Sequence, residues 1–198
     1  MTTLFGSRRQ FLRKFTFLAL SCTWLPTYAA VTEPPDEKLK ELLKQAISES
    51  VSFNDRFEAE VWLKDMSQRL LPIVPDHHHR LELLRTIHYE ASKANLQPEL
   101  VLAVIDVESR FNRWAISNVG AQGLMQIMPF WLKEIGHPKD NLFDIRTNLR
   151  MGCTILKYYI NVEKGNLVRA LERYNGSLGS FKYPNRVFGA LRNRWYKR

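Results

Sequence analysis

Apolar residues recur at helical spacing along most of the chain, and prolines and glycines mark where these segments begin or end. This pattern predicts helices over 36–49, 55–71, 80–94, 98–108, 147–162 and 166–174. A short helix is expected after Pro129 and a last one from Pro184. No segment alternates convincingly between polar and apolar residues as a strand would, so the sequence predicts an all-α fold.

One carboxylic acid stands on an apolar helical face. Glu108 follows three apolar residues at i, i+3 and i+4 spacing, namely Val101, Val104 and Ile105. Burial disfavours the charged form of a carboxyl group and raises its pKa, so a buried Glu108 could donate a proton near neutral pH. The alternative is that the helix ends at Glu108 and its carboxylate faces solvent. Asp106 lies off this face and is expected to be a surface acid.

A glycine-rich stretch follows this helix. Gly120 and Gly123 precede a short apolar run that contains Gln126 and ends at Pro129. Glycine allows positive φ and a close approach of the backbone to a ligand. Together with the amide of Gln126 and two methionines, the stretch could line a groove for a polar polymer.

Four motifs in order resemble the catalytic core of the soluble lytic transglycosylases, which share a fold with goose-type lysozyme. They are Glu108-Ser109, the segment from Gly120 to Pro129, the segment from Asn148 to Gly152, and Tyr174-Asn175. The resemblance covers residues 80–198 and implies a lysozyme-like (goose-type) helical bundle, preceded by an N-terminal helical extension.

The resemblance also implies the chemistry. Glu108 would be the single catalytic acid and base, cleaving the bond between N-acetylmuramic acid and N-acetylglucosamine in peptidoglycan and leaving a 1,6-anhydromuramyl end. No cofactor or metal is expected. Tyr174 would hydrogen-bond near the Glu108 carboxyl group. The substrate-binding residues implied are Ser117, Gln126, Met128, Tyr174 and Asn175.

Some of these roles have structural alternatives. Ser117 could cap a loop and Met128 could pack in the core, while Asn148 is expected to cap a helix. The chain departs from the family pattern in two places, 173–177 and 182–185, where it reads RYNGS and KYPN.

Two other functions remain open at this point. A hydrolytic muramidase would need a second carboxylate to position water, for which Asp144 and Glu134 are conceivable. A non-catalytic glycan-binding or assembly factor is the other.

Residues 1–30 read as an export signal, which predicts a periplasmic protein. The pair Arg8-Arg9 before Phe11-Leu12 resembles a twin-arginine signal. The alternatives are an ordinary secretory signal and lipidation at Cys22. Residues 31–75 would then be a linker and helical extension, and residues 76–198 the catalytic domain.

The net charge bears on the expected partners, and the number of cysteines bears on disulfide bonds. Residues 1–30 hold four basic residues and no acid, so the net charge falls from +9 to +5 without them. This small excess and the lack of a recognition motif argue against nucleic acid as a partner. They favour peptidoglycan strands and peripheral contact with the cell wall; no protein partner is predicted. Cys153 would be the only cysteine left, which excludes an intramolecular disulfide.

Three consecutive histidines follow Asp76 and raise the question of a metal site. Clustered imidazoles can bind zinc, but the side chains of His77, His78 and His79 would point in different directions on a helix. Asp76 is a good residue to cap the start of that helix.

Overall fold

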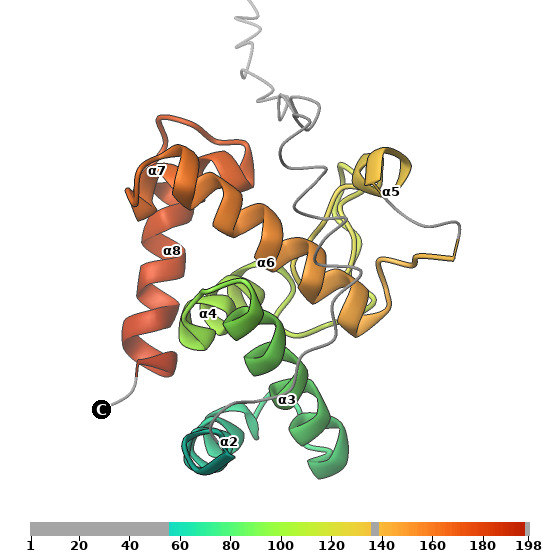
Figure 1. Ribbon diagram of the computed structural model, residues 1–198, viewed down its shortest axis with the longest axis vertical. Helices are drawn as coiled ribbons and strands as arrows, with labels where there is room; N and C mark the ends of the chain where they lie inside the picture. The colour runs from blue at the N-terminus through green and yellow to red at the C-terminus, as the bar shows by residue number, and fades with distance from the viewer. Residues whose placement is uncertain (1–55, 136–138, 197–198) are drawn as a thin grey trace, which may run out of the picture.

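The computed structural model describes residues 56–135 and 139–196, and this part of the chain is helical. The predicted signal over 1–30 and the predicted helix over 36–49 lie outside the described residues. Figure 1 shows the helices as α2 (Arg56–Leu70), α3 (His77–Lys93), α4 (Pro98–Glu108), α5 (Phe130–Ile135), α6 (Ile145–Val162), α7 (Leu167–Asn175) and α8 (Lys182–Ala190). A π-helical turn, η1 (Leu191–Trp195), continues α8. Within the described ranges only isolated β-bridges occur, so the all-α prediction is confirmed.

Helix α4 lies at the centre of the domain. Its residues from Leu100 to Ile105 are all buried, so it is covered on every side. Helices α3 and α8 and the turn η1 pack against it, and α6 crosses between α3 and α7. Helices α7 and α8 lie on one side of α4, while α5 and the loop that precedes it lie on the other (Figure 1).

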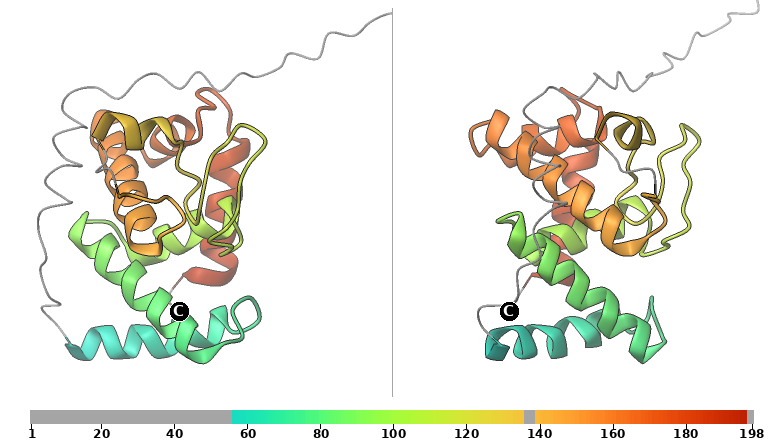
Figure 2. Two further views of the ribbon diagram at one scale, coloured as in Figure 1. Left: turned by 90° about the vertical axis from the view of Figure 1, so that its right-hand side faces the viewer. Right: turned by 45° about the vertical axis from the view of Figure 1, so that its right-hand side comes forward.

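Helix α2 lies at one end of the domain, next to α3 (Figure 2), and polar side-chain contacts join it to the rest of the fold. The Arg80 side chain, 6% exposed, donates to the Ser67 hydroxyl at 2.9 Å and to the Val74 carbonyl at 2.7 Å. Trp62 Nε1 donates to Glu99 Oε1 at 2.9 Å and so links α2 to the first turn of α4. In the described part of the chain, no helix has the length and apolar character needed to cross a membrane.

Helices α3, α6 and α7 each begin after a polar residue whose side chain accepts a hydrogen bond from an amide of the first turn. The Asp76 carboxylate accepts from the His79 amide at 2.7 Å, as predicted, so α3 begins at His77, three residues earlier than expected. Asn166, where the sequence predicts the next-to-last helix to begin, caps α7 in the same way. Helix α8 begins two residues before Pro184, because a proline needs no amide hydrogen within the first turn.

Candidate active site

Glu108 is the last residue of α4, and the chain turns sharply away just after it. Arg110 and Phe111 have φ values of 50° and 64°, a left-handed conformation that side chains other than glycine seldom adopt. The Phe111 ring is buried 5.4 Å from the ring of Trp195, which holds this turn in place. The helix therefore ends at Glu108, as one sequence alternative proposed, but its side chain is half-buried and does not turn fully into solvent.

The environment of the Glu108 carboxyl group favours a bound proton. Desolvation by burial raises the pKa of Glu108 from 4.5 to about 7. Two weaker effects oppose this increase: a hydrogen bond from Tyr183 and the positive charge of Arg186. A pKa in this range makes both the acid and the carboxylate accessible near neutral pH, so the group can give a proton and accept one back.

Tyr183 is the direct partner of this carboxyl group. Its hydroxyl donates to Glu108 Oε1 at 2.7 Å, and its side chain is only 4% exposed in the first turn of α8. Burial raises the pKa of Tyr183 well above 10, so the hydroxyl remains a donor. The sequence analysis assigned it no role, although a buried tyrosine near a helix start needs a hydrogen-bond partner.

Tyr174 was expected to hydrogen-bond near the Glu108 carboxyl group, but it binds the glycine-rich loop that contains Met125. Its hydroxyl donates to the Met125 carbonyl oxygen at 2.8 Å and not to Glu108. The negative charge of Glu108 still helps to raise the pKa of Tyr174, which places the two groups near each other. Asn175, the next residue, is exposed at the end of α7.

Asn148 fixes the glycine-rich loop against α6. Its buried amide accepts from the Met125 amide at 2.8 Å and donates to the Gln122 and Leu142 carbonyls at 2.9 Å each. The expectation that Asn148 caps a helix is therefore wrong. Asp144 caps α6, because its carboxylate accepts from the Thr147 amide at 2.8 Å.

Two glycines of this part of the structure are required by close packing. Gly123 has a φ of 78°, and a side chain there would collide with Asn148 and the Leu142 carbonyl. At Gly152 a side chain would collide with Met125. The close neighbour of Gly152 on α6 is therefore the glycine-rich loop.

The other predicted substrate residues, Ser117, Gln126 and Met128, belong to this loop. Gln126 has a φ of 50°, and its amide nitrogen donates to the Ala115 and Gly123 carbonyls at 3.1 and 2.9 Å. The Ser117 hydroxyl accepts from the Ala121 amide at 3.0 Å, as a loop cap would. Met128 is half-buried against the core. Ser117 therefore caps a loop and Met128 packs against the core, as the sequence analysis allowed. Their contact with substrate stays a prediction.

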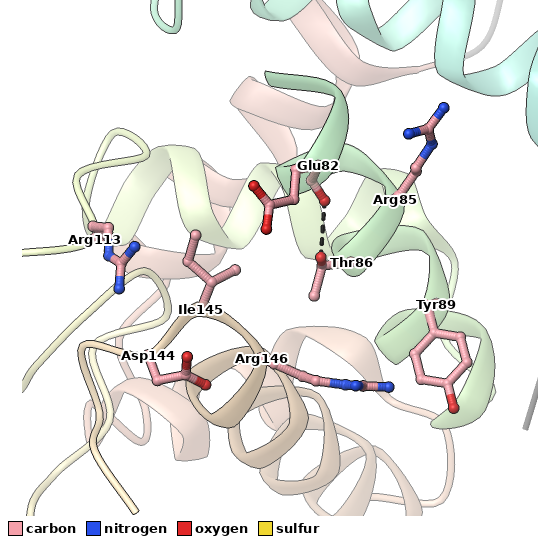
Figure 3. A pocket seen from close by; sticks show the side chains of 8 residues that line it. All are labelled: Glu82, Arg85, Thr86, Tyr89, Arg113, Asp144, Ile145 and Arg146. Atoms are coloured by element: carbon pink, nitrogen blue, oxygen red, sulfur yellow. Dashed lines mark hydrogen bonds between the residues drawn. The ribbon is translucent and has the colours of Figure 1, made fainter. Parts of the chain in front are cut away.

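The other acids considered from the sequence have different surroundings. Asp106 is not a surface acid: its side chain is 12% exposed and accepts from Arg194 at 3.1 Å and from Trp195 Nε1 at 3.0 Å. Asp144 lies with Arg113 in a pocket of about 390 Å³ between α3 and the start of α6, which neither Glu108 nor Tyr183 lines (Figure 3). The side chain of Glu134 lies outside the described residues.

The histidines near the start of α3 were considered as metal ligands, and Cys153 was expected to form no intramolecular disulfide. His77 and His78 lie edge to face in the first turn of α3. Among the residues that the structure describes, no three His, Cys, Asp or Glu side chains are grouped as a metal site would require. Cys153 is a free, buried thiol whose pKa burial raises.

Comparison with known proteins places this geometry in context. Residues 85–193 match the model of the family described as "Transglycosylase SLT domain". The chain is 32% identical over 145 residues to the membrane-bound lytic murein transglycosylase C of Yersinia enterocolitica, covering 63% of this chain and 39% of that protein. It is 35% identical over 96 residues to a transglycosylase of Enterobacteria phage PRD1, covering 48% of this chain and 35% of that protein. The chain thus spans less than two fifths of the length of these relatives.

A solved structure is also similar. An inactive mutant of the lytic transglycosylase Slt from Pseudomonas aeruginosa aligns with a TM-score of 0.46 at 26% identity, covering 61% of this chain and 21% of that one.

Proposed function

Because the chain belongs to the transglycosylase SLT domain family, we propose that it is a peptidoglycan lytic transglycosylase with Glu108 as its single catalytic carboxyl group. One observation carries the proposal most directly. Glu108 is a desolvated acid with a pKa of about 7, hydrogen-bonded by Tyr183, at the end of a buried helix. A group with these properties suits a reaction that needs an acid first and a base second.

The first step is cleavage of the glycosidic bond between N-acetylmuramic acid and N-acetylglucosamine. Protonated Glu108 donates its proton to the glycosidic oxygen, and the bond from that oxygen to C1 of the muramyl sugar breaks. The muramyl ring gains the positive charge of an oxocarbenium ion. Glu108 is left as a carboxylate, which the Tyr183 hydroxyl stabilises by its hydrogen bond.

The second step closes the muramyl ring on itself. The Glu108 carboxylate takes the proton from the C6 hydroxyl as that oxygen forms a bond to C1. The product is a 1,6-anhydromuramyl end, Glu108 is protonated again, and no water is consumed. One carboxyl group is sufficient because the attacking oxygen belongs to the substrate and needs no second group to position it.

The loop from Ser117 to Met128 would form one wall of the substrate groove. We assign substrate contacts to Ser117, Gln126, Met128, Tyr174 and Asn175. Tyr174 would also hold this wall in place, because its hydroxyl donates to the Met125 carbonyl oxygen.

The substrate also suggests where the protein works. A protein that acts on peptidoglycan must reach the cell envelope, and one relative is named as a membrane-bound murein enzyme. We therefore propose a cell-envelope location, on the periplasmic side, reached through the signal read in residues 1–30.

Product analysis by mass spectrometry tests the function. Digestion of purified peptidoglycan should yield muropeptides that are lighter by one water than the hydrolysed forms. Glu108→Gln should lower the yield at least about 100-fold, because the amide keeps the shape of the side chain but cannot donate a catalytic proton. Asp144→Asn is the matched control, since asparagine also caps helices, and should stay within a few-fold of the parent. Reducing muramic acid ends from the parent would instead indicate a hydrolase.

A further inference from the structure

Arg186 lies at the edge of the candidate active site. It follows Tyr183 by three residues on α8, so both side chains lie on neighbouring positions of one helical face. Its Nη2 donates to the Val107 carbonyl at 3.2 Å, which brings the guanidinium group to the last turn of α4 beside Glu108. The residue is exposed, so this group also reaches solvent.

Most of the binding capacity of this guanidinium group is unused by the protein. A guanidinium group carries five N–H donors in a planar fork that matches a carboxylate. Within the described ranges, the Val107 carbonyl is its one hydrogen-bond acceptor, and no carboxylate forms an ion pair with it. Arg194, on η1, differs because it is paired with Asp106.

We propose that Arg186 binds a carboxylate of the substrate, carried by the substituent on the muramyl sugar next to the scissile bond. This inference rests on the proposed function. The muramyl sugar bears a lactyl group whose carboxylate is free in peptide-free strands, and whose attached peptide brings carboxylates of its own. The shared chemistry is a carboxylate within reach of a sugar that is held at Glu108.

If Arg186 binds a substrate carboxylate, substrate binding changes the pKa of Glu108. Two groups on α8, Tyr183 and Arg186, lower the pKa of Glu108. On α7, the charge of Glu108 raises the pKa of Tyr174. A carboxylate bound to Arg186 would neutralise the guanidinium charge. The pKa of Glu108 would then rise when the substrate binds, which keeps the proton in place until it is transferred.

The test compares Arg186→Gln with Arg192→Gln on matched substrates. Arg192 is exposed on η1, so the control removes the same charge away from Glu108. One substrate is peptidoglycan strands with free peptide carboxylates, the second is the same strands with these carboxylates converted to amides, and the third is peptide-free strands. Steady-state kinetics and the pH dependence of kcat and of kcat/KM are measured by mass spectrometry of the products.

Arg186→Gln should lower kcat/KM about 5-fold on strands with free carboxylates, mainly through KM. It should have no such effect on amidated strands, on which the parent should be weaker by the same factor. The alkaline limb of the parent's kcat profile should also lie higher on the free-carboxylate strands. A loss on peptide-free strands would assign the lactyl carboxylate, and a loss confined to peptide-bearing strands would assign the peptide.

Equal losses on free and amidated strands, with no larger loss on peptide-free strands, would overturn the proposal, because Arg186 would then have only a structural role. Absence of anhydro products from the parent on all substrates would instead be a failure of the proposed function. Binding of the three strand preparations to Glu108→Gln protein, with and without Arg186→Gln, tests the carboxylate site even in that case. If Arg186→Gln weakens the binding of all three preparations equally, or of none of them, the carboxylate site is refuted.

Discussion

Replacing Glu108 with glutamine should stabilise the protein at alkaline pH and leave its stability nearly unchanged at acid pH. The native pKa of about 7 lies above the value of 4.5 for an exposed glutamate. The folded state therefore binds the proton more tightly than the unfolded state. The stability that Glu108 contributes is fully present below pH 4.5 and is lost as the pH rises to about 7.

The size of the effect follows from the two pKa values. Their difference corresponds to about 3 kcal/mol, at about 1.4 kcal/mol for each tenfold change in proton affinity. Most of this loss, about 2 to 3 kcal/mol, falls between pH 5 and pH 8. Glutamine cannot ionise and has no such loss, so Glu108→Gln should gain this amount over the parent across that interval. For a chain of this size the gain is about 5 to 10 °C in Tm.

Thermal unfolding followed by circular dichroism at pH 5 and pH 8 measures this difference. Glu82→Gln is the matched control, because Glu82 is an exposed glutamate on α3 and keeps its hydration in the folded state. Its Tm relative to the parent should be the same at both pH values. If the Tm difference for Glu108→Gln is also independent of pH, the carboxyl group is hydrated and the reasoning from burial is wrong.

Three further substitutions probe the groups around Glu108. Tyr183→Phe removes a hydrogen bond that favours the Glu108 carboxylate, so it should lower turnover by at least about 10-fold and move the alkaline limb of the pH–rate profile to higher pH; an unchanged profile would contradict this role. Asn148→Asp turns two donated hydrogen bonds into repulsion between carboxylate and carbonyl oxygens, and chemical denaturation should show a loss of about 3 kcal/mol; unaltered stability would mean that the loop is held by other contacts. Gly152→Ala should reduce stability by about 1 to 2 kcal/mol in the same assay, since the added methyl group meets Met125; a more stable variant would show that Met125 moves aside freely.

Local chemistry made the helices predictable from sequence. Helix caps such as Asp76 and Asn166 act on amides two or three residues away, so their effect can be read from neighbouring residues. The apolar face that carries Glu108 is equally local, because it repeats within one helix. These features yielded the all-α fold, most helix ends and the candidate acid.

The contacts around the acid depend on the fold and could not be read in this way. Tyr183 meets Glu108 across 75 residues of sequence. Asn148 reaches Met125 across 23 residues, so its resemblance to a helix cap was misleading. Phe111 has a positive φ although it is not a glycine, so no local residue indicated this turn; its ring is buried against other parts of the fold.

Digestion of peptidoglycan in water enriched in ¹⁸O tests the central claim most directly. If Glu108 moves one proton out and back and the C6 hydroxyl closes the muramyl ring, no solvent oxygen enters the product. Mass spectrometry should then find anhydromuramyl ends without ¹⁸O. Muramic acid ends that carry one ¹⁸O atom would show that water attacks C1, and would contradict the single-carboxyl transglycosylase account.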